Sequence, residues 1–159
     1  MCTGCENPHT ELVTLLCLAT GARWSEAEKL RPNRLKGNVV TYAGTKSGKV
    51  RSVPISRELA DRIRKHWRTH GQFTSCITSF RWALKRTTIK LPKGQAAHVL
   101  RHTFASHFIQ NGGNLFTLQK ILGHSTVAMT MRYAHLAPEH LRDVLRFGPL
   151  TSDSAQHNM

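Results

Sequence analysis

Four residues between positions 98 and 133 have side chains that together suit chemistry at a phosphate group. His98 and Arg101 stand three residues apart, so a helix there would place them on one face. His124 follows between a glycine and a serine, and Tyr133 comes nine residues later. A guanidinium grips a phosphate through its fork, an imidazole shares or exchanges protons, and a phenol can attack phosphorus. The spacing therefore predicts a phosphate-handling site in this part of the chain.

Two upstream segments would supply the remaining cations of such a site. Arg23 lies in TGARWSE between two expected helices, and Lys46 lies in GTKSGKVRSVP beside Lys49. Taken alone, Arg23 is typical of a solvated surface charge, and lysines in a turn are usually exposed without a function. These residues become candidates only through the set to which they belong.

Attack on a phosphodiester would require a specific role of each of these residues. Charge develops on the non-bridging oxygens, and arginine N–H groups stabilise it because they are always charged. A phenol with a pKa of about 10 needs a nearby base or a cationic field before Tyr133 can act as a nucleophile. The departing alkoxide needs a proton, which Lys46 or a histidine could give. The sequence has no carboxylate cluster that would hold magnesium, so it predicts chemistry with no metal and no cofactor. The product would be a phosphotyrosine.

The charge of the chain is its most unusual bulk property. Lys and Arg number 23 against 9 Asp and Glu over 159 residues, a formal net charge of +14. Such a field favours a polyanion as partner, with nucleic acid as the first candidate; the alternative is a basic protein with no such partner. No apolar run approaches the ~18 residues that span a bilayer, and the N-terminus has no signal-peptide core. We therefore expect a cytoplasmic protein that does not bind membranes.

The four cysteines do not have the pattern of a disulfide framework. Cys17 lies in an apolar run and Cys76 in a polar connection, so both are predicted to be reduced thiols. Cys2 and Cys5, with His9 nearby, have part of the spacing of a zinc knuckle, but no fourth ligand follows at a recognisable distance. A metal site is therefore not predicted.

The first half of the chain is expected to form three helices and a small antiparallel sheet. Thr10 would cap a buried helix over 11–20, and Ser25 would cap a short helix that ends before Pro32. The β-branched runs at 38–44 and 50–55 read as two strands joined by a polar turn. Ser56 then caps a helix with apolar residues every four positions, which Gly71 closes.

The second half is expected to be helical throughout. Helices are predicted over 78–87 and over 96–111, the second with a core stripe and two structural histidines, His102 and His107. Further helices follow, capped by Asn114 and by Ser125, and a last one begins near Pro138; their ranges are 115–122, 126–134 and 138–147. The domain prediction is a leader over 1–9, one domain over 10–150 and a tail over 151–159. The fold class is mainly α with a small antiparallel β-sheet.

In the order and local sequence of these residues, the chain resembles the catalytic domain of the tyrosine recombinase (lambda-type phage integrase) family, and is most similar to temperate-phage integrases. The resemblance runs from about Thr10 to Leu150. Its boxes are TGARWSE, GTKSGKVRSVPI, HVLRHTFAS, LGHS and TMRYAH. It implies the fold of that family and assigns the six catalytic residues Arg23, Lys46, His98, Arg101, His124 and Tyr133, with Glu26 in support. By this resemblance Tyr133 is the nucleophile and Lys46 the general acid for the leaving 5′ oxygen.

The resemblance also implies a biological role. Full-length members would bind double-stranded DNA as a tetramer in the bacterial nucleoid and would integrate or excise phage DNA through a 3′-phosphotyrosine. The N-terminal core-site-binding domain of the family has no room before Arg23, so the expectation is a catalytic fragment or a truncated product. Two rivals remain open: a catalytically idle DNA-binding remnant, and a strand-passage enzyme of the type IB topoisomerase kind. The segment 138–150 would dock either on its own domain or on a neighbouring protomer.

Overall fold

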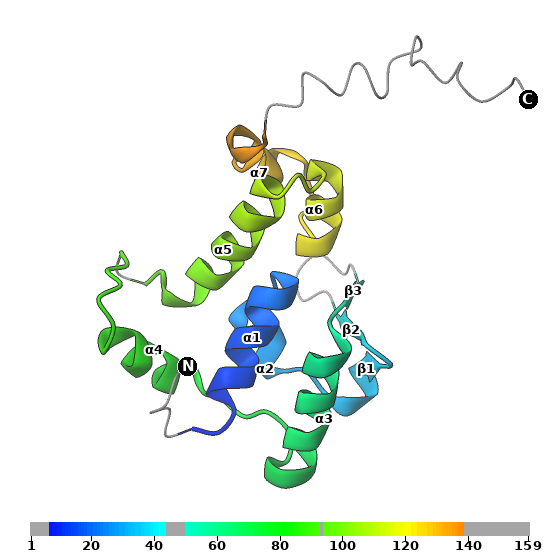
Figure 1. Cartoon of the computed structure of the whole chain (residues 1–159), viewed down its shortest axis with the longest axis vertical. Coiled ribbons are helices and arrows are strands. Elements are labelled where there is room, and N and C mark those ends of the chain that lie inside the picture. Colours follow the sequence, from blue (N-terminus) through cyan, green and yellow to red (C-terminus); the bar gives the residue numbers. More distant parts are fainter. Residues whose placement is uncertain (1–6, 44–49, 93, 139–159) are drawn as a thin grey trace, which may run out of the picture.

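Helix α1 (Thr10–Thr20) lies near the middle of the molecule (Figure 1). The computed structural model describes residues 7–43, 50–92 and 94–138. Because α1 carries apolar groups nearly all round, Val13, Leu16 and Cys17 are completely buried. The helix ends where Gly21 takes a left-handed conformation, with φ of 62°, and its N–H binds the Cys17 carbonyl. The predicted end at Gly21 is thus confirmed.

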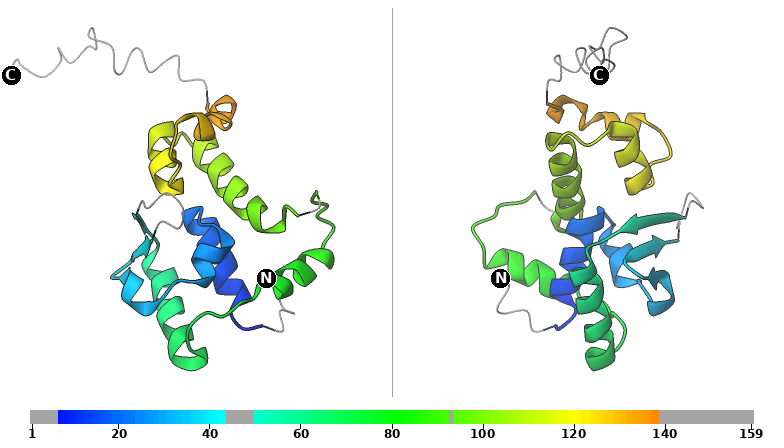
Figure 2. Two further views of the ribbon diagram at one scale, coloured as in Figure 1. Left: turned by 180° about the vertical axis from the view of Figure 1, so that it is seen from behind. Right: turned by 45° about the vertical axis from the view of Figure 1, so that its right-hand side comes forward.

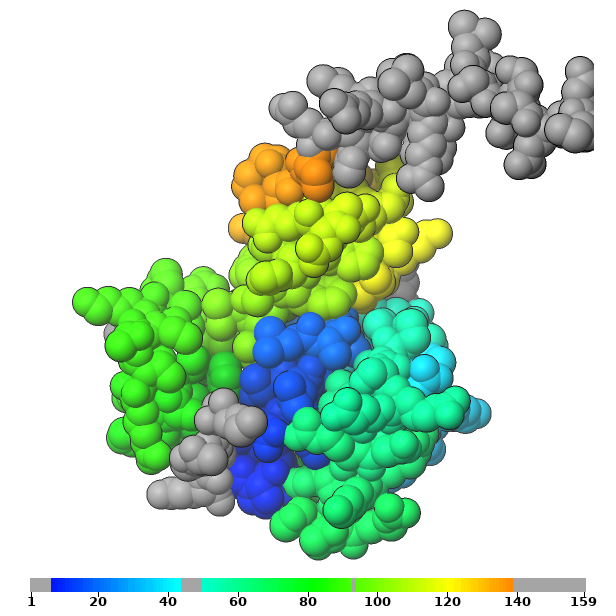
Figure 3. Space-filling model, in the orientation of Figure 1, coloured from blue at the N-terminus to red at the C-terminus, as the bar shows by residue number. Residues whose placement is uncertain are grey.

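The remaining elements form two groups along the chain. The first group surrounds α1 and consists of α2 (Trp24–Glu28), η1 (Pro32–Arg34), β1 (Leu35–Lys36), β2 (Val39–Tyr42), β3 (Arg51–Pro54), α3 (Arg57–His70) and α4 (Ile77–Lys85). The second group consists of α5 (Ala96–Gln110), α6 (Leu115–Leu122), α7 (Ala128–Met131) and η2 (Ala134–Leu136). The two views in Figure 2 show α5 leaving the first group beside α1 and carrying α6 and α7 at its far end. In the space-filling view α1 is visible between α4 and α3 (Figure 3).

The three strands form one antiparallel sheet in the order β1-β2-β3. Val40 pairs with Leu35 on one side and with Val53 on the other, and all three side chains are buried. The two predicted strands are confirmed, whereas β1 was not predicted because two residues are too short a run to show a period. The turn predicted between β2 and β3, with Lys46 and Lys49, lies outside the described residues.

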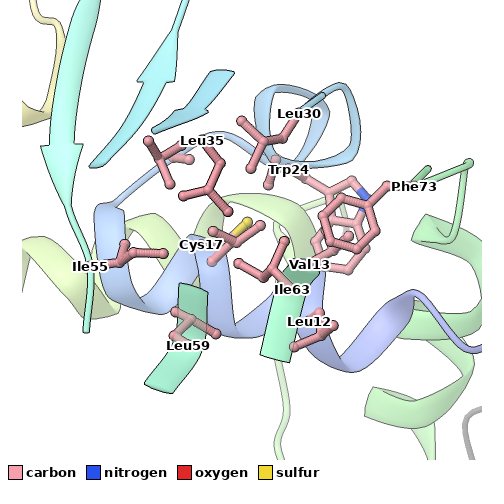
Figure 4. Close-up of a cluster of buried hydrophobic side chains, with 14 of the residues drawn as sticks. Leu12, Val13, Cys17, Trp24, Leu30, Leu35, Ile55, Leu59, Ile63 and Phe73 are labelled. Carbon is pink, nitrogen blue, oxygen red and sulfur yellow. The ribbon is translucent and has the colours of Figure 1, made fainter. Parts of the chain in front are cut away.

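Two apolar clusters hold these groups together. The larger one lies between α1, α2, the sheet and α3, where side chains such as Cys17, Leu35 and Ile63 meet (Figure 4). Trp24 of α2 stacks on Phe80 of α4 with ring centroids 4.6 Å apart. The smaller cluster joins α5, α6 and the last turns through buried side chains of Ala105, Ile109, Leu118, Leu122 and Tyr133.

The residues at the N-caps of the helices agree with some of the predicted caps and differ from others. Ser56 accepts a hydrogen bond from the Leu59 N–H, and Asn114 accepts from Phe116 and Thr117, so both caps are confirmed. The predicted cap at Ser25 is wrong, because α2 begins two residues earlier than predicted, at Trp24, with Arg23 at the N-cap. The cap predicted at Ser125 is also wrong: α7 begins only at Ala128, after the N-cap Val127.

The described residues contain no helix that is both long and apolar enough to cross a membrane. The last predicted helix, after Pro138, falls outside them. The cap predicted at Thr10 is wrong, because Thr10 is the first residue of α1 and His9 stands at the N-cap. His9 is buried and its Nδ1 lies 2.8 Å from His66 Nε2 of α3.

Candidate active site

Arg101 of α5 lies where the ends of two helices meet. Its Nη1 donates to the Gly21 carbonyl at 2.8 Å and its Nη2 donates to the Leu122 carbonyl at 2.6 Å. These oxygens belong to the C-terminal ends of α1 and α6, where unpaired carbonyls and the helix dipole favour a cation. Burial, followed by the charges of Arg23 and Arg51, lowers the pKa of Arg101 to about 10. The guanidinium therefore remains charged at neutral pH although only 7% of the residue is exposed.

The two helices end in the same way, and each end delivers one candidate residue. Gly21 after α1 and Gly123 after α6 both take the left-handed conformation, with φ of 62° and 67°. The chain leaves Gly21 toward Arg23 and leaves Gly123 directly into His124. Both residues therefore emerge beside the carbonyls that Arg101 binds.

Glu26 is the one carboxylate within this group of arginines among the described residues. Its two oxygens accept from Arg51 Nη1 at 3.0 Å and Arg51 Nη2 at 2.6 Å. It also accepts from the Arg23 backbone N–H at 2.7 Å and lies 3.3 Å from Arg23 Nη1. Burial alone would raise the pKa of Glu26, but the hydrogen bonds and charges of Arg51 and Arg23 outweigh it and lower the pKa. A charged Glu26 thus binds both arginines and fixes their positions.

His124 lies inside the same cationic field. Its Nδ1 is 2.9 Å from the hydroxyl oxygen of Thr130, a buried residue of α7. Burial lowers the pKa of His124 to about 4, and the charges of Arg101, Arg23, Arg132 and Arg51 act in the same direction. The imidazole is neutral at pH 7, so it can donate a hydrogen bond to an anion without carrying a charge of its own.

Tyr133 follows α7 and is 6% exposed. Its Oη lies 2.6 Å from Nδ1 of His102, which stands next to Arg101 on α5. Burial raises the pKa of Tyr133, while the charges of Arg132 and Arg101 oppose that rise. The phenol thus sits in the field of the arginine that binds the two helix ends.

His98 is exposed on the first turn of α5, one turn before His102. It lines an open cavity of about 580 Å³ together with His102 and Arg132. This placement leaves the imidazole of His98 accessible at the edge of the group of arginines.

The structure brings most of the predicted site residues together. Arg23, Arg101 and His124 act on one another electrostatically, Tyr133 lies beside Arg101, and Glu26 holds Arg23. Lys46 lies outside the described residues. The catalytic roles themselves remain predictions.

Three neighbours of the site were not predicted as part of it: Arg51, His102 and Thr130. Arg51 carried a usable signal, because it stands two residues before buried Val53 on β3 and so lies on the same inward face. His102 was expected to be a partly buried structural histidine, and its partner could not be identified from sequence because it lies 31 positions away. No group of three or more His, Cys, Asp or Glu within the described residues is arranged to hold a metal ion.

Comparison with known proteins identifies the family. Residues 1–140 match the model of the phage integrase family. The chain belongs to the phage integrase family. It is 52% identical over 149 residues to the integrase of Escherichia phage 186, covering 94% of this chain and 44% of that protein. The chain thus spans less than half the length of that relative, and the same holds for the integrase of Haemophilus phage HP1, of which it covers 44%.

Solved structures give the same answer for the fold. The catalytic domain of bacteriophage HP1 integrase superposes with a TM-score of 0.87 at 52% identity, covering 95% of this chain and 89% of that one. The XerH site-specific recombinase, solved with a difH substrate, superposes with a TM-score of 0.66 at 21% identity over 88% of this chain and 46% of that one. The predicted family and the predicted fold class, mainly α with a small antiparallel sheet, are confirmed.

Proposed function

We propose that this chain cleaves and rejoins DNA strands through a 3′-phosphotyrosine formed on Tyr133. The observation that carries the proposal is that Arg101 interacts electrostatically with Arg23, with His124 and with the Tyr133 phenol. A group of cations and neutral donors with a single buried carboxylate suits a bound phosphodiester, because its charge is uncompensated until an anion arrives.

Each residue takes a role that its surroundings support. Arg101 is rigid, since two of its N–H groups are fixed on carbonyls. Its remaining N–H groups have no partner among the described residues and would bind a non-bridging oxygen. Arg23, whose side chain is 44% exposed, supplies the solvent-side half of the clamp. His124 donates as a neutral imidazole, and Glu26 keeps the arginines oriented.

The leaving group defines the remaining roles. Expulsion of the 5′ oxygen requires a proton, and we assign its delivery to Lys46 because of its position in the motif GTKSGKVRSVPI. We assign to His98, which is exposed one turn before His102, the binding of the phosphate from the open side.

The substrate that fits is double-stranded DNA, which the +14 charge would attract. Because the chain is 52% identical to the integrase of phage 186, we assign it to integration or excision of phage DNA. Assembly as a tetramer on DNA would belong to the full-length protein.

A nicked suicide duplex tests the proposal. Cleavage of such a substrate loses a short fragment and traps the covalent adduct, which is counted after denaturing electrophoresis. Wild type should form the adduct and Tyr133→Phe should form none, because only the attacking oxygen is removed. Tyr42→Phe is the matched control. Tyr42 is buried in the larger apolar cluster with its hydroxyl oxygen 3.0 Å from that of Thr20, and loss of this hydroxyl should leave adduct formation unchanged.

Mass spectrometry of the digested adduct should place the nucleotide on the peptide that contains Tyr133. An adduct that persists in Tyr133→Phe would overturn the assignment of the nucleophile. Tight DNA binding by a wild type that forms no adduct would favour the rival, a catalytically idle DNA-binding remnant.

A further inference from the structure

The phenol of Tyr133 has a partner that lies outside the six predicted catalytic residues. Nδ1 of His102 is 2.6 Å from Oη of Tyr133, shorter than the ordinary distance of about 2.8 Å for a hydroxyl hydrogen bond. The two rings lie with centroids 5.9 Å apart. The contact joins α5 to the turn after α7. It places Nδ1 of His102 within hydrogen-bonding distance of Oη of Tyr133, the atom that would attack phosphorus.

We propose that His102 is the general base that takes the proton of Tyr133 during attack on the phosphodiester. This inference rests on the proposed function. The Oη–H bond breaks and an Nδ1–H bond forms, while Oη bonds to phosphorus and the P–O5′ bond breaks. The electron pair of that bond leaves on O5′, which is protonated by the general acid. In rejoining, the imidazolium of His102 returns its proton to the departing phenolate.

His102 is held in the form that such a base needs. Burial lowers its pKa, and the charges of Arg132, His98 and Arg101 lower it further, so the ring is neutral at pH 7. With its hydrogen on Nε2, the neutral ring leaves Nδ1 bare and the phenol donates to it. A bound phosphate would offset the neighbouring arginine charges and raise the proton affinity of His102 at the moment of attack.

The two predicted catalytic histidines are less well placed for this step. His124 has its Nδ1 occupied by Thr130, and a pKa of about 4 makes it a weak base. His98 is exposed and precedes His102 by one helical turn. Only His102 of the three is within hydrogen-bonding distance of the Tyr133 hydroxyl in the described structure.

A different reading of the same contact makes His102 a latch that holds the phenol away from DNA. The two readings predict opposite signs. Removal of a base slows cleavage, whereas removal of a latch speeds it.

Three variants separate these readings on the suicide duplex. His102→Asn keeps an acceptor oxygen near the position of Nδ1 but cannot take up a proton at neutral pH. His102→Ala removes the ring beside the open cavity and leaves room for added imidazole. His107→Asn is the matched control, because His107 is exposed on the same helix and lies outside the site.

We expect His102→Asn to form the Tyr133 adduct about 10²–10⁴ times more slowly than wild type, with unchanged DNA affinity. The wild-type rate should fall as pH drops through the pKa of His102, because the protonated ring accepts no proton. The rate of His102→Asn should show no step at that pKa. Imidazole should restore the rate of His102→Ala, and His107→Asn should match wild type throughout.

A substrate with a 5′-bridging sulfur assigns the direction of proton transfer. Sulfur leaves without a proton, so it would rescue the loss of an acid but not the loss of a base. The His102→Asn defect should therefore persist on this substrate.

Wild-type rates in His102→Asn across the pH range would overturn the inference and leave the proposed function standing. Faster cleavage would establish the latch in its place, and rescue by the sulfur substrate would make His102 an acid. A wild type that forms no adduct at Tyr133 would overturn the proposed function, and this inference with it.

Discussion

Arg23 and Arg101 are the same side chain in opposite surroundings. The side chain of Arg23 is 44% exposed and, within the part of the chain that the structure describes, is bound only by Glu26. Arg101 is 7% exposed and is fixed on two helix-end carbonyls. Both contribute a positive charge to the same candidate site. Their contributions to folding must therefore differ even where their contributions to chemistry are alike.

Replacement of each arginine by lysine should expose this difference. An ammonium cannot reproduce the fork, so Arg23→Lys and Arg101→Lys should each lower the cleavage rate by ~10²-fold or more. Arg101→Lys should also lower the free energy of unfolding by about 1–3 kcal/mol, because at least one buried carbonyl loses its donor. Urea denaturation beside the adduct assay measures both effects. Equal stability losses in the two variants would contradict the structural role of Arg101.

The pair of Glu26 and Arg51 makes stability depend on pH. The pKa of Glu26 is lowered in the folded state, so its ionisation contributes stability above the unfolded-state pKa. That contribution is lost as pH falls through the folded-state value. Glu26→Gln should cost on the order of 3 kcal/mol at pH 7, because Arg51 is left as a buried charge without its counter-ion. The difference in stability between Glu26→Gln and wild type should shrink toward pH 3. Thermal unfolding over pH 3–7 measures this difference, and a difference that stays constant with pH would contradict the prediction.

At the scale of the elements, the site depends on how α1 and α6 end. Each helix stops at a left-handed glycine, and each stop presents a carbonyl to Arg101 and a candidate residue to the site. Gly21 is also a point of close approach. A Cβ there would lie 2.5 Å from Phe104 Cδ1 and 2.7 Å from Leu122 Cδ2. The turn therefore needs glycine for its conformation and for its lack of a side chain.

Gly21→Ala and Gly37→Ala form a matched pair that separates the two needs. Gly37 has φ of 56°, but a methyl group added there would meet nothing within 4 Å, so alanine should cost only the backbone strain of about 1–2 kcal/mol. Gly21→Ala adds the clash, and we expect a total loss of about 2–5 kcal/mol. Urea midpoints measure both variants. Equal losses would show that Phe104 and Leu122 move aside freely.

Sequence predicted these helix ends because their signals are local. The caps at Ser56 and Asn114 and the stops at Gly21 and Gly123 each depend on residues within one turn. The start of α2 was misassigned because Ser25 looked like a cap, although Glu26 already bonds the Arg23 N–H. The start of α7 was misassigned for a similar reason, since Ser125 also has a side chain typical of an N-cap.

The site was predictable only in part, because some of its contacts join distant positions. A resemblance assigned Arg23, Arg101, His124 and Tyr133, and the structure places them together. The pairing of Glu26 with Arg51 spans 25 positions, and that of His102 with Tyr133 spans 31. Neither follows from helical or strand periodicity, which fixes the face of a residue but not its partner.

At the scale of the whole molecule, net charge is the property that bears on the proposed DNA partner. A net charge of +14 on 159 residues creates a long-range attraction that no single contact provides. Basic side chains also gather away from the candidate nucleophile, as in the cavity of about 370 Å³ lined by Lys29, Arg31 and Arg34 beside the sheet. DNA contact should therefore extend well beyond the reacting phosphate.

Binding to unrelated duplexes should be insensitive to sequence and steeply dependent on salt. Each phosphate contact releases condensed counter-ions, so log K should fall linearly with log salt, with a slope of roughly −0.9 per contact. Fluorescence anisotropy at several salt concentrations measures this slope. Arg31→Ala with Arg34→Ala should reduce it by about two, and a flat salt response would contradict the proposed DNA partner.

The double anchorage of Arg101 bears on how such a gene decays. A descendant copy under no demand to act on DNA can lose Arg23 at little cost to folding, because that side chain reaches solvent. It cannot lose Arg101 as readily, because the ends of α1 and α6 would each be left with an unbound carbonyl. Relics of this lineage should therefore keep the second arginine after the first has drifted away, and its survival alone is poor evidence of an active enzyme.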